Sequence, residues 1–347
     1  MRKNSQISLA IERLRQQKGA MACLWILVAL YAAVLFAPVL APYDYSDENR
    51  EYSYCPPTAV EFFDQGKLVG PFVYGRQMTF DQYHRRIYTK ALDQKYPVRF
   101  FHNGRLLTVD APGRLYLLGA DSRGRDLLSR LLYGGRISLS IGLLGVLISF
   151  GLGLIAGGIA GYYGGIVDAV VMRVCEMFML VPGFYLMLAL RSAVPDNFNS
   201  VQIYIMVVVI LAFIGWASLA RVIRGMALSL RGRDYVAAAK LLGLSDGAII
   251  VRHILPHTIS YSLVAIMLTI PGYIIGEAGL SVLGLGIQDP VPSWGNLLSE
   301  AMGIAHIRHE PWILWPGFLI FITVVCFNVV GDALRDALDP MMKEVKV

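Results

Sequence analysis

Six long runs of apolar residues constrain the fold of this chain more than any other feature of its sequence. Each run approaches the roughly 20 residues that an α-helix needs to cross a bilayer core of about 30 Å. Across the chain 56% of residues are hydrophobic and 16% are charged, against about 45–50% and about 25% in a soluble domain. The sequence therefore predicts an all-α polytopic membrane protein with six transmembrane helices. The runs cover approximately residues 19–41, 137–160, 167–190, 201–220, 259–275 and 312–330.

Basic residues gather in two of the polar segments, residues 1–18 and the loop 221–252. Because cytoplasmic loops are enriched in Lys and Arg, we expect both segments in the cytoplasm. The first transmembrane helix then covers 19–42, and a tail at 341–347 returns the C-terminus to the cytoplasm. A signal peptide is the alternative, but the run is too long for one and lacks a small-residue cleavage site. The same enrichment of cytoplasmic loops in Lys and Arg explains the net charge of +6, so the charge does not imply binding to nucleic acid.

Residues 43–117 form a polar insert between the first two runs. Residues 98–102, Asn103-Gly104 and 105–109 predict a β-hairpin. A capping-box pattern at 79–82 and an apolar face through residue 92 predict a helix. We therefore expect a small α+β domain outside the cytoplasm. Its aromatic residues could line a binding surface but more often form a core; they are Phe62, Phe63, Phe72, Tyr74, Phe100 and Phe101.

Glycine spacing in the second run predicts close helix packing. Gly153, Gly157 and Gly161 recur every four residues, so they share one helix face. Small residues on such a stripe let the backbones of two membrane helices approach closely.

A polar-edged stretch at 234–257 separates the fourth and fifth runs. Residues 236–242 are rich in Ala and Leu, which favour helix, and Gly243 supplies a break. Ser245 can cap a second helix that runs to Pro256. The stretch predicts a short helix, a turn and a second helix. On local physics alone it is equally an ordinary cytoplasmic loop.

This stretch resembles the "EAA" loop of ABC importer permeases, through its alanines, its glycine and its Ile-Leu-Pro sequence. In that family the loop forms a coupling helix that docks into a groove on an ATPase subunit. The family usually has Glu where this chain has Ala237, which leaves Arg233, Asp234 and Lys240 as candidate polar contacts. The resemblance implies an ATPase-coupling loop made of Asp234, Ala237, Ala238, Ala239, Gly243, Ile254, Leu255 and Pro256.

A second match covers residues 117–139. It resembles the "LGTD-x-x-GRD-x-x-SRL-x-YG-x-RISL" signature of the dipeptide/oligopeptide/nickel branch of ABC permeases, with Ala120 in place of the usual Thr. Residues 126–133 have apolar and charged sides, which predicts a segment lying along the membrane surface. The matching residues are Gly119, Asp121, Gly124, Arg125, Asp126, Ser129, Arg130, Tyr133, Gly134 and Arg136.

Two further segments resemble signatures of the same branch. Residues 276–295 resemble "GE-x-x-LSFLGLG…P-x-x-SWG", and this Gly-broken segment predicts a re-entrant loop that lines a cavity or packs on protein. Residues 328–340 resemble the branch's C-terminal signature. The matching residues are Glu277, Gly284, Gly286, Trp294, Gly295, Asp332, Arg335, Asp336, Asp339 and Pro340.

The resemblance implies a type I ABC importer permease core over 118–340 in a bacterial inner membrane. It implies alternating access, driven by ATPase subunits through the loop at 234–257. The implied partners are a second permease subunit, two ATPase subunits that carry ATP and Mg²⁺, an extracytoplasmic solute-binding protein and membrane lipid. It implies peptide cargo, with nickel or another small solute as the alternative.

The sequence lacks the motifs that several kinds of enzyme and metal site require. It contains no phosphate-binding Gly-x4-Gly-Lys-Ser/Thr loop and no hydrolase motif, so we expect no enzyme activity and no cofactor in this chain. His253 and His257 are four apart, but no third metal ligand is evident. An ion-driven secondary transporter is the alternative from another class. It calls for inverted repeats and midplane carboxylates, and Glu277 is expected nearer the outer side.

Overall fold

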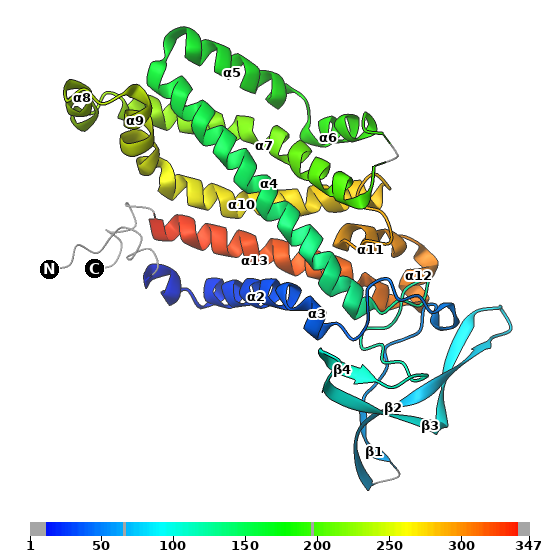
Figure 1. The fold of residues 1–347 in the computed structure, drawn as a ribbon. Coiled ribbons are helices and arrows are strands. Elements are labelled where there is room, and N and C mark those ends of the chain that lie inside the picture. Colours follow the sequence, from blue (N-terminus) through cyan, green and yellow to red (C-terminus); the bar gives the residue numbers. More distant parts are fainter. Residues whose placement is uncertain (1–11, 65–66, 196–197, 339–347) are drawn as a thin grey trace. The chain divides into compact units, whose positions relative to one another are not determined.

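The computed structural model describes residues 12–64, 67–195 and 198–338 of the 347-residue chain. Within these residues five helical segments are long and apolar enough to cross a membrane, or up to six if a bent pair forms one span. The six apolar runs therefore correspond to helices (Figure 1). The five segments are α2 (Lys18–Leu35), α4 (Leu127–Tyr163), α7 (Ser200–Leu230), Asp246–Val282 and Pro311–Leu338.

The chain divides into two compact units, and several long helices run from one unit into the other. The first unit comprises the described parts of Met1–Leu27, Ser140–Glu277 and Ile322–Val347. The second comprises Val28–Leu139 and Ala278–Phe321, less the undescribed residues 65–66.

In the first unit α4 and α7 approach closely along the predicted glycine stripe. A Cβ on Gly153 would lie 2.7 Å from a methyl carbon of Leu219, and one on Gly157 would lie 2.4 Å from the carbonyl oxygen of Ala220. A larger side chain at either position would therefore push the helices apart. The expected close packing is confirmed, and α7 is the partner helix.

The third apolar run is broken instead of forming one straight helix. α5 (Gly165–Leu180) and α6 (Gly183–Ser192) bend by 86° at Val181 and Pro182. Proline lacks an N–H donor and keeps the preceding residue out of the helical region, which accounts for the break. The predicted span over 167–190 is therefore a broken span or a re-entrant loop. Arg224 of α7 holds α5 through a bidentate ion pair with Asp168. Its Nε lies 2.8 Å from Asp168 Oδ1, and its Nη2 contacts Oδ2.

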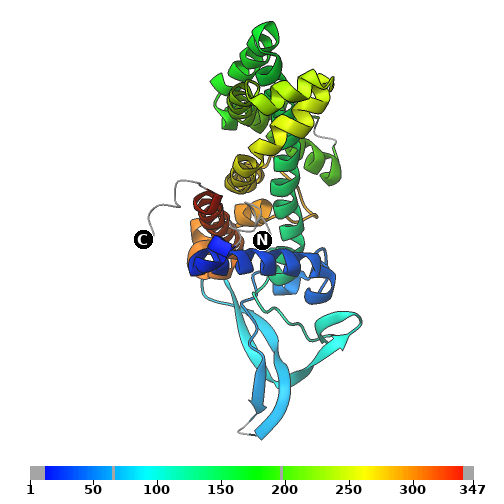
Figure 2. The same ribbon diagram turned by 90° about the vertical axis from the view of Figure 1, so that its left-hand side faces the viewer.

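The second unit contains the insert, an antiparallel four-stranded sheet in the order β1–β2–β3–β4. Its strands β2 and β3 form a long, twisted hairpin (Figures 1 and 2). Asn103 (φ 53°) and Gly104 (φ 75°) form the β3–β4 turn, and two positive φ values are typical of a tight hairpin. The predicted hairpin is confirmed. The strands are β1 (Glu61–Asp64), β2 (Lys67–Phe80), β3 (Arg86–His102) and β4 (Arg105–Val109).

The helix expected after Thr79 is wrong. Thr79 pairs with Ile87 across the β2–β3 hairpin. Asp81 closes the turn between them because its Oδ1 accepts hydrogen bonds from the backbone N–H groups of Tyr83 and Arg85, both at 2.8 Å. The polar residues taken for a helix cap therefore form a side-chain-stabilised turn. In place of an α+β domain the insert is a sheet with one 3₁₀ turn, η1 (Arg50–Tyr52).

Most of the six aromatic residues named for the insert do not form its core, whereas Tyr116 is buried beside Cys55, with Tyr52 and Tyr88 packed against them. Phe72 is buried, and Val73, Val98 and Leu115 make up one buried cluster. A long two-stranded ribbon has more surface than its few packing partners can cover, so side chains along it stay in contact with solvent. The exposed fraction of the residue is half or more at Phe62, Phe63, Phe100 and Phe101.

Residues 126–133 do not form a separate surface segment. They begin α4, which starts at Leu127 and is continuous to Tyr163. Asp126 caps the helix, since its Oδ2 accepts hydrogen bonds from the backbone N (2.8 Å) and Oγ (2.6 Å) of Ser129. Leu127 and Leu131 are buried, so the apolar side of this turn packs on protein.

α10 and the elements not yet named complete the described chain. α10 runs past its predicted end to Val282, and Gly284 (φ 74°) follows it. The remaining elements are α3 (Ala37–Leu40), α8 (Asp234–Leu241), α9 (Asp246–Ile249), the π-helical turn η2 (Ile250–Ile254), η3 (Leu255–Thr258), α10 (Ile259–Val282), α11 (Trp294–Glu300), α12 (Ile304–His309), η4 (Pro311–Leu314) and α13 (Trp315–Leu338).

Candidate functional site

The stretch 234–257 forms the predicted helix, turn and helix. α8 ends at Leu241, and Gly243 follows with φ 78°, a left-handed conformation that glycine adopts without steric cost. The backbone N–H of Leu244 donates to the carbonyl of Ala239 at 3.2 Å, which closes the turn. Ser245 then caps α9 by accepting a hydrogen bond from the backbone N–H of Ala248 at 3.4 Å. Ile254, Leu255 and Pro256 continue the helical path through η2 and η3.

A small apolar core holds this segment together. Val236 and Ala239 of α8 pack with Ile249 and Ile254 of the following turns and with Ala227 of α7. Each fully buried large aliphatic side chain contributes about 1.5–3 kcal/mol. α8 is therefore a fixed element. Of the three motif alanines, Ala239 belongs to this core, whereas Ala237 and Ala238 face outward.

The outer side of α8 carries an apolar tip. Leu241 is 89% exposed and Leu242 is 80% exposed, and Tyr235 is also exposed. Arg233, Asp234 and Lys240 of the same segment are also exposed. Exposed apolar side chains that stand next to each other are candidates for a contact with another protein.

The segment is also tied to the end of α4. The Tyr162 hydroxyl donates a hydrogen bond to Asp246 Oδ1 at 2.6 Å. Arg231 donates to the carbonyl oxygen of Tyr162 at 3.4 Å. Movement of α8 and α9 would therefore reach α4 directly.

The charged residues of the first signature gather into a buried cluster in the second unit. Asp121 accepts hydrogen bonds from Arg125 Nε at 2.7 Å and from Arg130 Nη1. Both arginines also reach Asp289, at 3.2 Å and 2.7 Å, and Arg125 lies 3.5 Å from Glu300. Removing one member of a buried pair typically costs about 3–5 kcal/mol. The cluster therefore fixes the α10–α11 loop against the start of α4.

The cluster sets the charge states of its members. Burial acts to raise the pKa of Asp289, but Arg130 and Arg125 outweigh it and hold that pKa below its usual range. Burial raises the pKa of Glu300, and the negative charge of Asp121 adds to the rise. Burial also raises the pKa of Asp126 to about 7, against the hydrogen bonds from Ser129. Its Oδ1 has no hydrogen-bond partner among the described residues.

Five of the six signature glycines stand where neighbouring atoms leave no room for a side chain; Gly284 is the exception, with φ 74° and no atom within 4 Å of an added Cβ. Gly124 has φ 72°, and its Cβ would lie 1.8 Å from the carbonyl oxygen of Asn49. The Cβ of Gly295 would lie 2.7 Å from Cα of Ala278. Any other residue would therefore displace backbone at these sites. A Cβ would also meet an atom within 3.2 Å at Gly119, Gly134 and Gly286.

Other signature residues anchor α4 to its neighbours. Trp294 is buried, and its Nε1 donates to the carbonyl of Leu131 at 3.0 Å. Arg136 donates to the carbonyl oxygens of Val34 at 2.8 Å and Leu35 at 2.9 Å. These carbonyls close α2 and lack partners within it. The Arg136 guanidinium also lies 5.2 Å from the centre of the Tyr133 ring.

The C-terminal signature is not brought into the charged cluster. Asp332, Arg335 and Asp336 are exposed on α13, and Arg335 lines a cavity of about 500 Å³ with Tyr261. Glu277 of α10 is fully buried. Asp339 and Pro340 lie outside the described residues.

Sequence reasoning missed Asp289, Glu300 and Tyr162. No motif in the sequence pointed to these three residues. Arg125 and Arg130 could have indicated that carboxylates lie near them, because buried arginines need partners of opposite charge. The charge of Asp289, which directly precedes Pro290 in a largely apolar segment, was the available signal. It also missed the exposed pair Leu241 and Leu242, because apolar residues at the end of a helix read equally well as core.

In the described part of the chain no three His, Cys, Asp or Glu side chains are placed to hold a metal ion. The ring of His257 packs against the ring of Tyr235, with centroids 5.2 Å apart.

Comparison with known proteins places the chain in a family. Residues 152–344 match the family described as "Binding-protein-dependent transport system inner membrane component", and residues 5–57 match the "N-terminal TM domain of oligopeptide transport permease C". The chain is 30% identical over 337 residues to the oligopeptide transport system permease protein OppC of Bacillus subtilis, covering 96% of this chain and 90% of that protein. It is 41% identical over 226 residues to OppC of Haemophilus influenzae, covering 65% and 70%.

Among solved structures, an inward-facing MetNI methionine ABC transporter aligns with 60% of this chain and 96% of its own, with 18% identity and a TM-score of 0.43. The assignment does not depend on this partial likeness. The family match covers more than half of the described chain, and the first relative named above spans nearly all of it. The chain belongs to the family of binding-protein-dependent transport system inner membrane components.

Proposed function

We propose that this chain is the transmembrane permease subunit of an ATP-driven peptide importer, working by alternating access. The observation that carries the proposal is the α8–Gly243–α9 segment, which has a packed apolar core and an exposed apolar tip. Such a segment can transmit force, because it moves as a body and offers a surface to a partner. A docked ATPase would move α8, and Tyr162 would pass that movement to α4.

The partners follow from this mechanism. Two ATPase subunits with ATP and Mg²⁺ would dock at the tip, a second permease subunit would complete the membrane pathway, and an extracytoplasmic solute-binding protein would deliver cargo. The ATPase partner must make different contacts in its open and closed states, since only a differential interaction can shift a conformational equilibrium.

The orientation follows from the charges. Arg231, Arg233 and Arg252 flank the α8–α9 segment, and the positive-inside rule supports a cytoplasmic position for it. If the bent pair α5–α6 crosses the membrane as one span, six spans return both termini to the cytoplasm of a bacterial inner membrane. One span separates the basic N-terminal segment from the sheet insert, which we place outside.

Peptide cargo is proposed because several relatives are named oligopeptide or dipeptide permeases. The test is uptake of a labelled oligopeptide into proteoliposomes that contain this chain, its partner permease, both ATPases and the binding protein. We expect uptake that requires ATP on the side of α8 and survives dissipation of ion gradients. This chain alone should not hydrolyse ATP.

Two results would contradict the proposal. Uptake driven by an ion gradient without ATP would make the chain a secondary transporter. ATP-driven uptake of nickel or another solute with no peptide uptake would overturn the cargo.

A further inference from the structure

A cavity of about 500 Å³ lies between α10 and α13 in the first unit. The two helices touch where Gly331 of α13 faces Leu268 of α10, since a Cβ on Gly331 would lie 2.6 Å from a methyl carbon of that leucine. From this contact the cavity extends to Ser260, near the start of α10, and to Leu338 at the end of α13 (Figure 1). At about 1.5 Å per residue the cavity runs about 12 Å along α10.

The walls of this cavity are apolar along their length and polar at one end. Ser260 and Tyr261 lie in the first turn of α10, and Arg335 lies in the last turn of α13. The polar groups therefore gather where the two helices end. The apolar lining residues are Val264, Ala265, Leu268 and Leu338.

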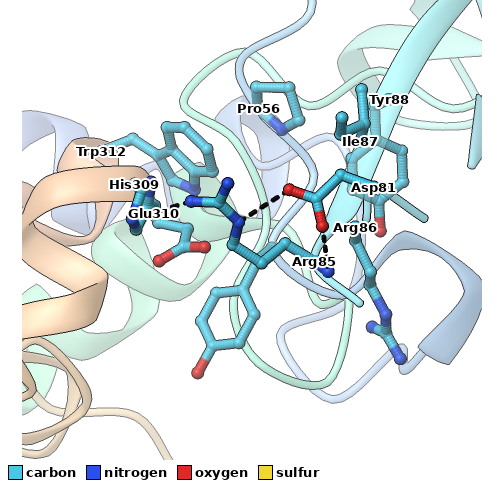
Figure 3. A pocket seen from close by; sticks show the side chains of 10 residues that line it. Pro56, Asp81, Arg85, Arg86, Ile87, Tyr88, His309, Glu310 and Trp312 are labelled. Atoms are coloured by element: carbon cyan, nitrogen blue, oxygen red, sulfur yellow. Dashed lines mark hydrogen bonds and ion pairs between the residues drawn. The ribbon is translucent and has the colours of Figure 1, made fainter. Parts of the chain in front are cut away.

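The guanidinium group of Arg335 is available to a ligand. Its side chain is exposed and forms no ion pair or hydrogen bond with another described residue. Asp332 and Asp336 are its neighbours on α13, but neither lies within ion-pair distance of it and neither lines the cavity. In a second cavity, of about 520 Å³ in the second unit, the lining arginine is already paired, because Arg85 Nε lies 2.8 Å from Asp81 Oδ2 (Figure 3).

The polar end of the α10–α13 cavity falls at the level of lipid headgroups. α10 continues from the α8–α9 segment through η2 and η3, so the orientation proposed above puts its first turn at the cytoplasmic surface. Tyrosine is enriched at this level of a membrane, and arginines near helix ends extend towards it. Basic pockets between membrane helices on the cytoplasmic side are suited to phosphate headgroups. An apolar groove that ends at an unpaired guanidinium thus matches a hydrocarbon chain that carries a phosphate.

We propose that this cavity binds one glycerophospholipid, with its phosphate on Arg335 and an acyl chain along Val264 and Ala265. The negative phosphate complements the guanidinium, which can donate two parallel hydrogen bonds to it. The hydroxyl of Tyr261 can donate a further hydrogen bond to a phosphate oxygen. The lipid would therefore contact α10, the helix that continues from the α8–α9 segment. The site goes beyond the proposed function, because binding requires neither ATP nor cargo.

The test is photo-crosslinking of the purified full chain in a maltoside detergent, which carries no phosphate. The probe is phosphatidylglycerol with a diazirine on one acyl chain, and mass spectrometry locates the labelled peptides. Three competitors separate the parts of the ligand. They are unlabelled phosphatidylglycerol, diacylglycerol, which lacks the phosphate, and glycerol 3-phosphate, which lacks the chains.

The variant is Arg335→Gln, and the matched control is Arg252→Gln. Arg252 is an exposed base of the same unit that does not line the cavity, so both changes remove one positive charge. We expect labels to concentrate on residues 260–268 and 331–338, and only phosphatidylglycerol to compete. Arg335→Gln should weaken labelling by about tenfold or more, since it removes charged hydrogen bonds, whereas Arg252→Gln should label like wild type.

Several results would overturn the proposal. They are labels spread evenly over the apolar helices, competition by diacylglycerol equal to that by phosphatidylglycerol, and equal labelling of the two variants. A repeat with the partner permease bound separates a lipid site from a subunit contact. Labelling that persists in the pair supports the lipid site, whereas labelling abolished by the partner would make the groove a subunit interface. Peptide uptake enters none of these outcomes, so the proposed function and this inference can fail separately.

Discussion

The hydroxyl of Tyr162 lies 2.6 Å from Asp246 Oδ1 and joins the last turn of α4 to the first turn of α9. A hydrogen bond to a charged group is typically worth about 1.5–3 kcal/mol. This contact is therefore strong enough to keep the two elements moving together. It gives the α8–α9 segment a direct connection to a membrane-spanning helix.

Tyr162→Phe should loosen that connection. We expect more ATP to be hydrolysed per peptide imported, because the ATPases can close without moving α4 fully. The measurement is the ratio of phosphate released to peptide accumulated in proteoliposomes. The control is Tyr163→Phe, at the exposed neighbouring residue. An unchanged ratio in Tyr162→Phe would remove this hydrogen bond from the coupling path.

Substitutions at Gly243 should impair transport through backbone strain and not through the size of the new side chain. Its φ is 78°, and an added Cβ would meet no atom within 4 Å in this chain. Gly243→Asn should therefore retain transport, because Asn tolerates the left-handed region, whereas Gly243→Leu should lose most of it. Transport assays on membranes with equal amounts of each variant compare the two. Similar loss in both variants would point to a space requirement in the docked partner.

Loss of the proton from the Asp126 carboxyl group should make the protein less stable as the pH rises. Burial raises its pKa to about 7 from an ordinary value of 3.8. Between about pH 4 and pH 7 the folded state holds a proton that the unfolded state has released, so the free energy of unfolding falls as the pH rises. The raised pKa of Glu300 acts in the same direction. We expect a lower Tm at pH 8 than at pH 5.

The matched variant is Asp126→Asn, which keeps an oxygen to cap α4 but does not titrate. It should flatten the dependence of Tm on pH over this range. A wild-type Tm that rises from pH 5 to pH 8, or an equal slope in Asp126→Asn, would contradict the assignment.

Orientation of the insert can be measured with a cysteine at Asp93, an exposed position on β3. Asn103 is a poorer choice, because its φ of 53° would strain a cysteine. Cys55 should react little, since it is fully buried and burial raises its pKa to about 12. Asp93→Cys should react with a membrane-impermeant thiol reagent in intact spheroplasts. Labelling only after the membrane is ruptured would reverse the proposed orientation.

The helices and the β3–β4 hairpin could be predicted because their signals are local. Runs of about 20 apolar residues, the Gly243 break and the Asn103-Gly104 turn each specify their own structure. The spacing of Gly153 and Gly157 likewise predicted close packing, although it could not identify α7 as the partner.

Other features depend on contacts distant in sequence. The apolar spacing from Phe80 to Leu92 fits a helix, but pairing with β2 overrides it. Asp289 joins Arg125 and Arg130 across more than 150 residues, which no local pattern reveals. Ala238 is exposed and Ala239 is buried, a difference that follows only from the packing of α8 on its neighbours.

The most direct test of the account replaces the apolar tip of α8 with the double variant Leu241→Ser, Leu242→Ser. Both side chains are 80% exposed or more, so the fold should survive. The control is Leu92→Ser, 67% exposed on the insert. The measurement is ATP-dependent peptide uptake together with co-purification of the ATPase subunits. We expect the double variant to lose both by about tenfold or more, as hot-spot residues do, while the control keeps both. Normal uptake and normal ATPase association in the double variant would contradict the coupling role of α8.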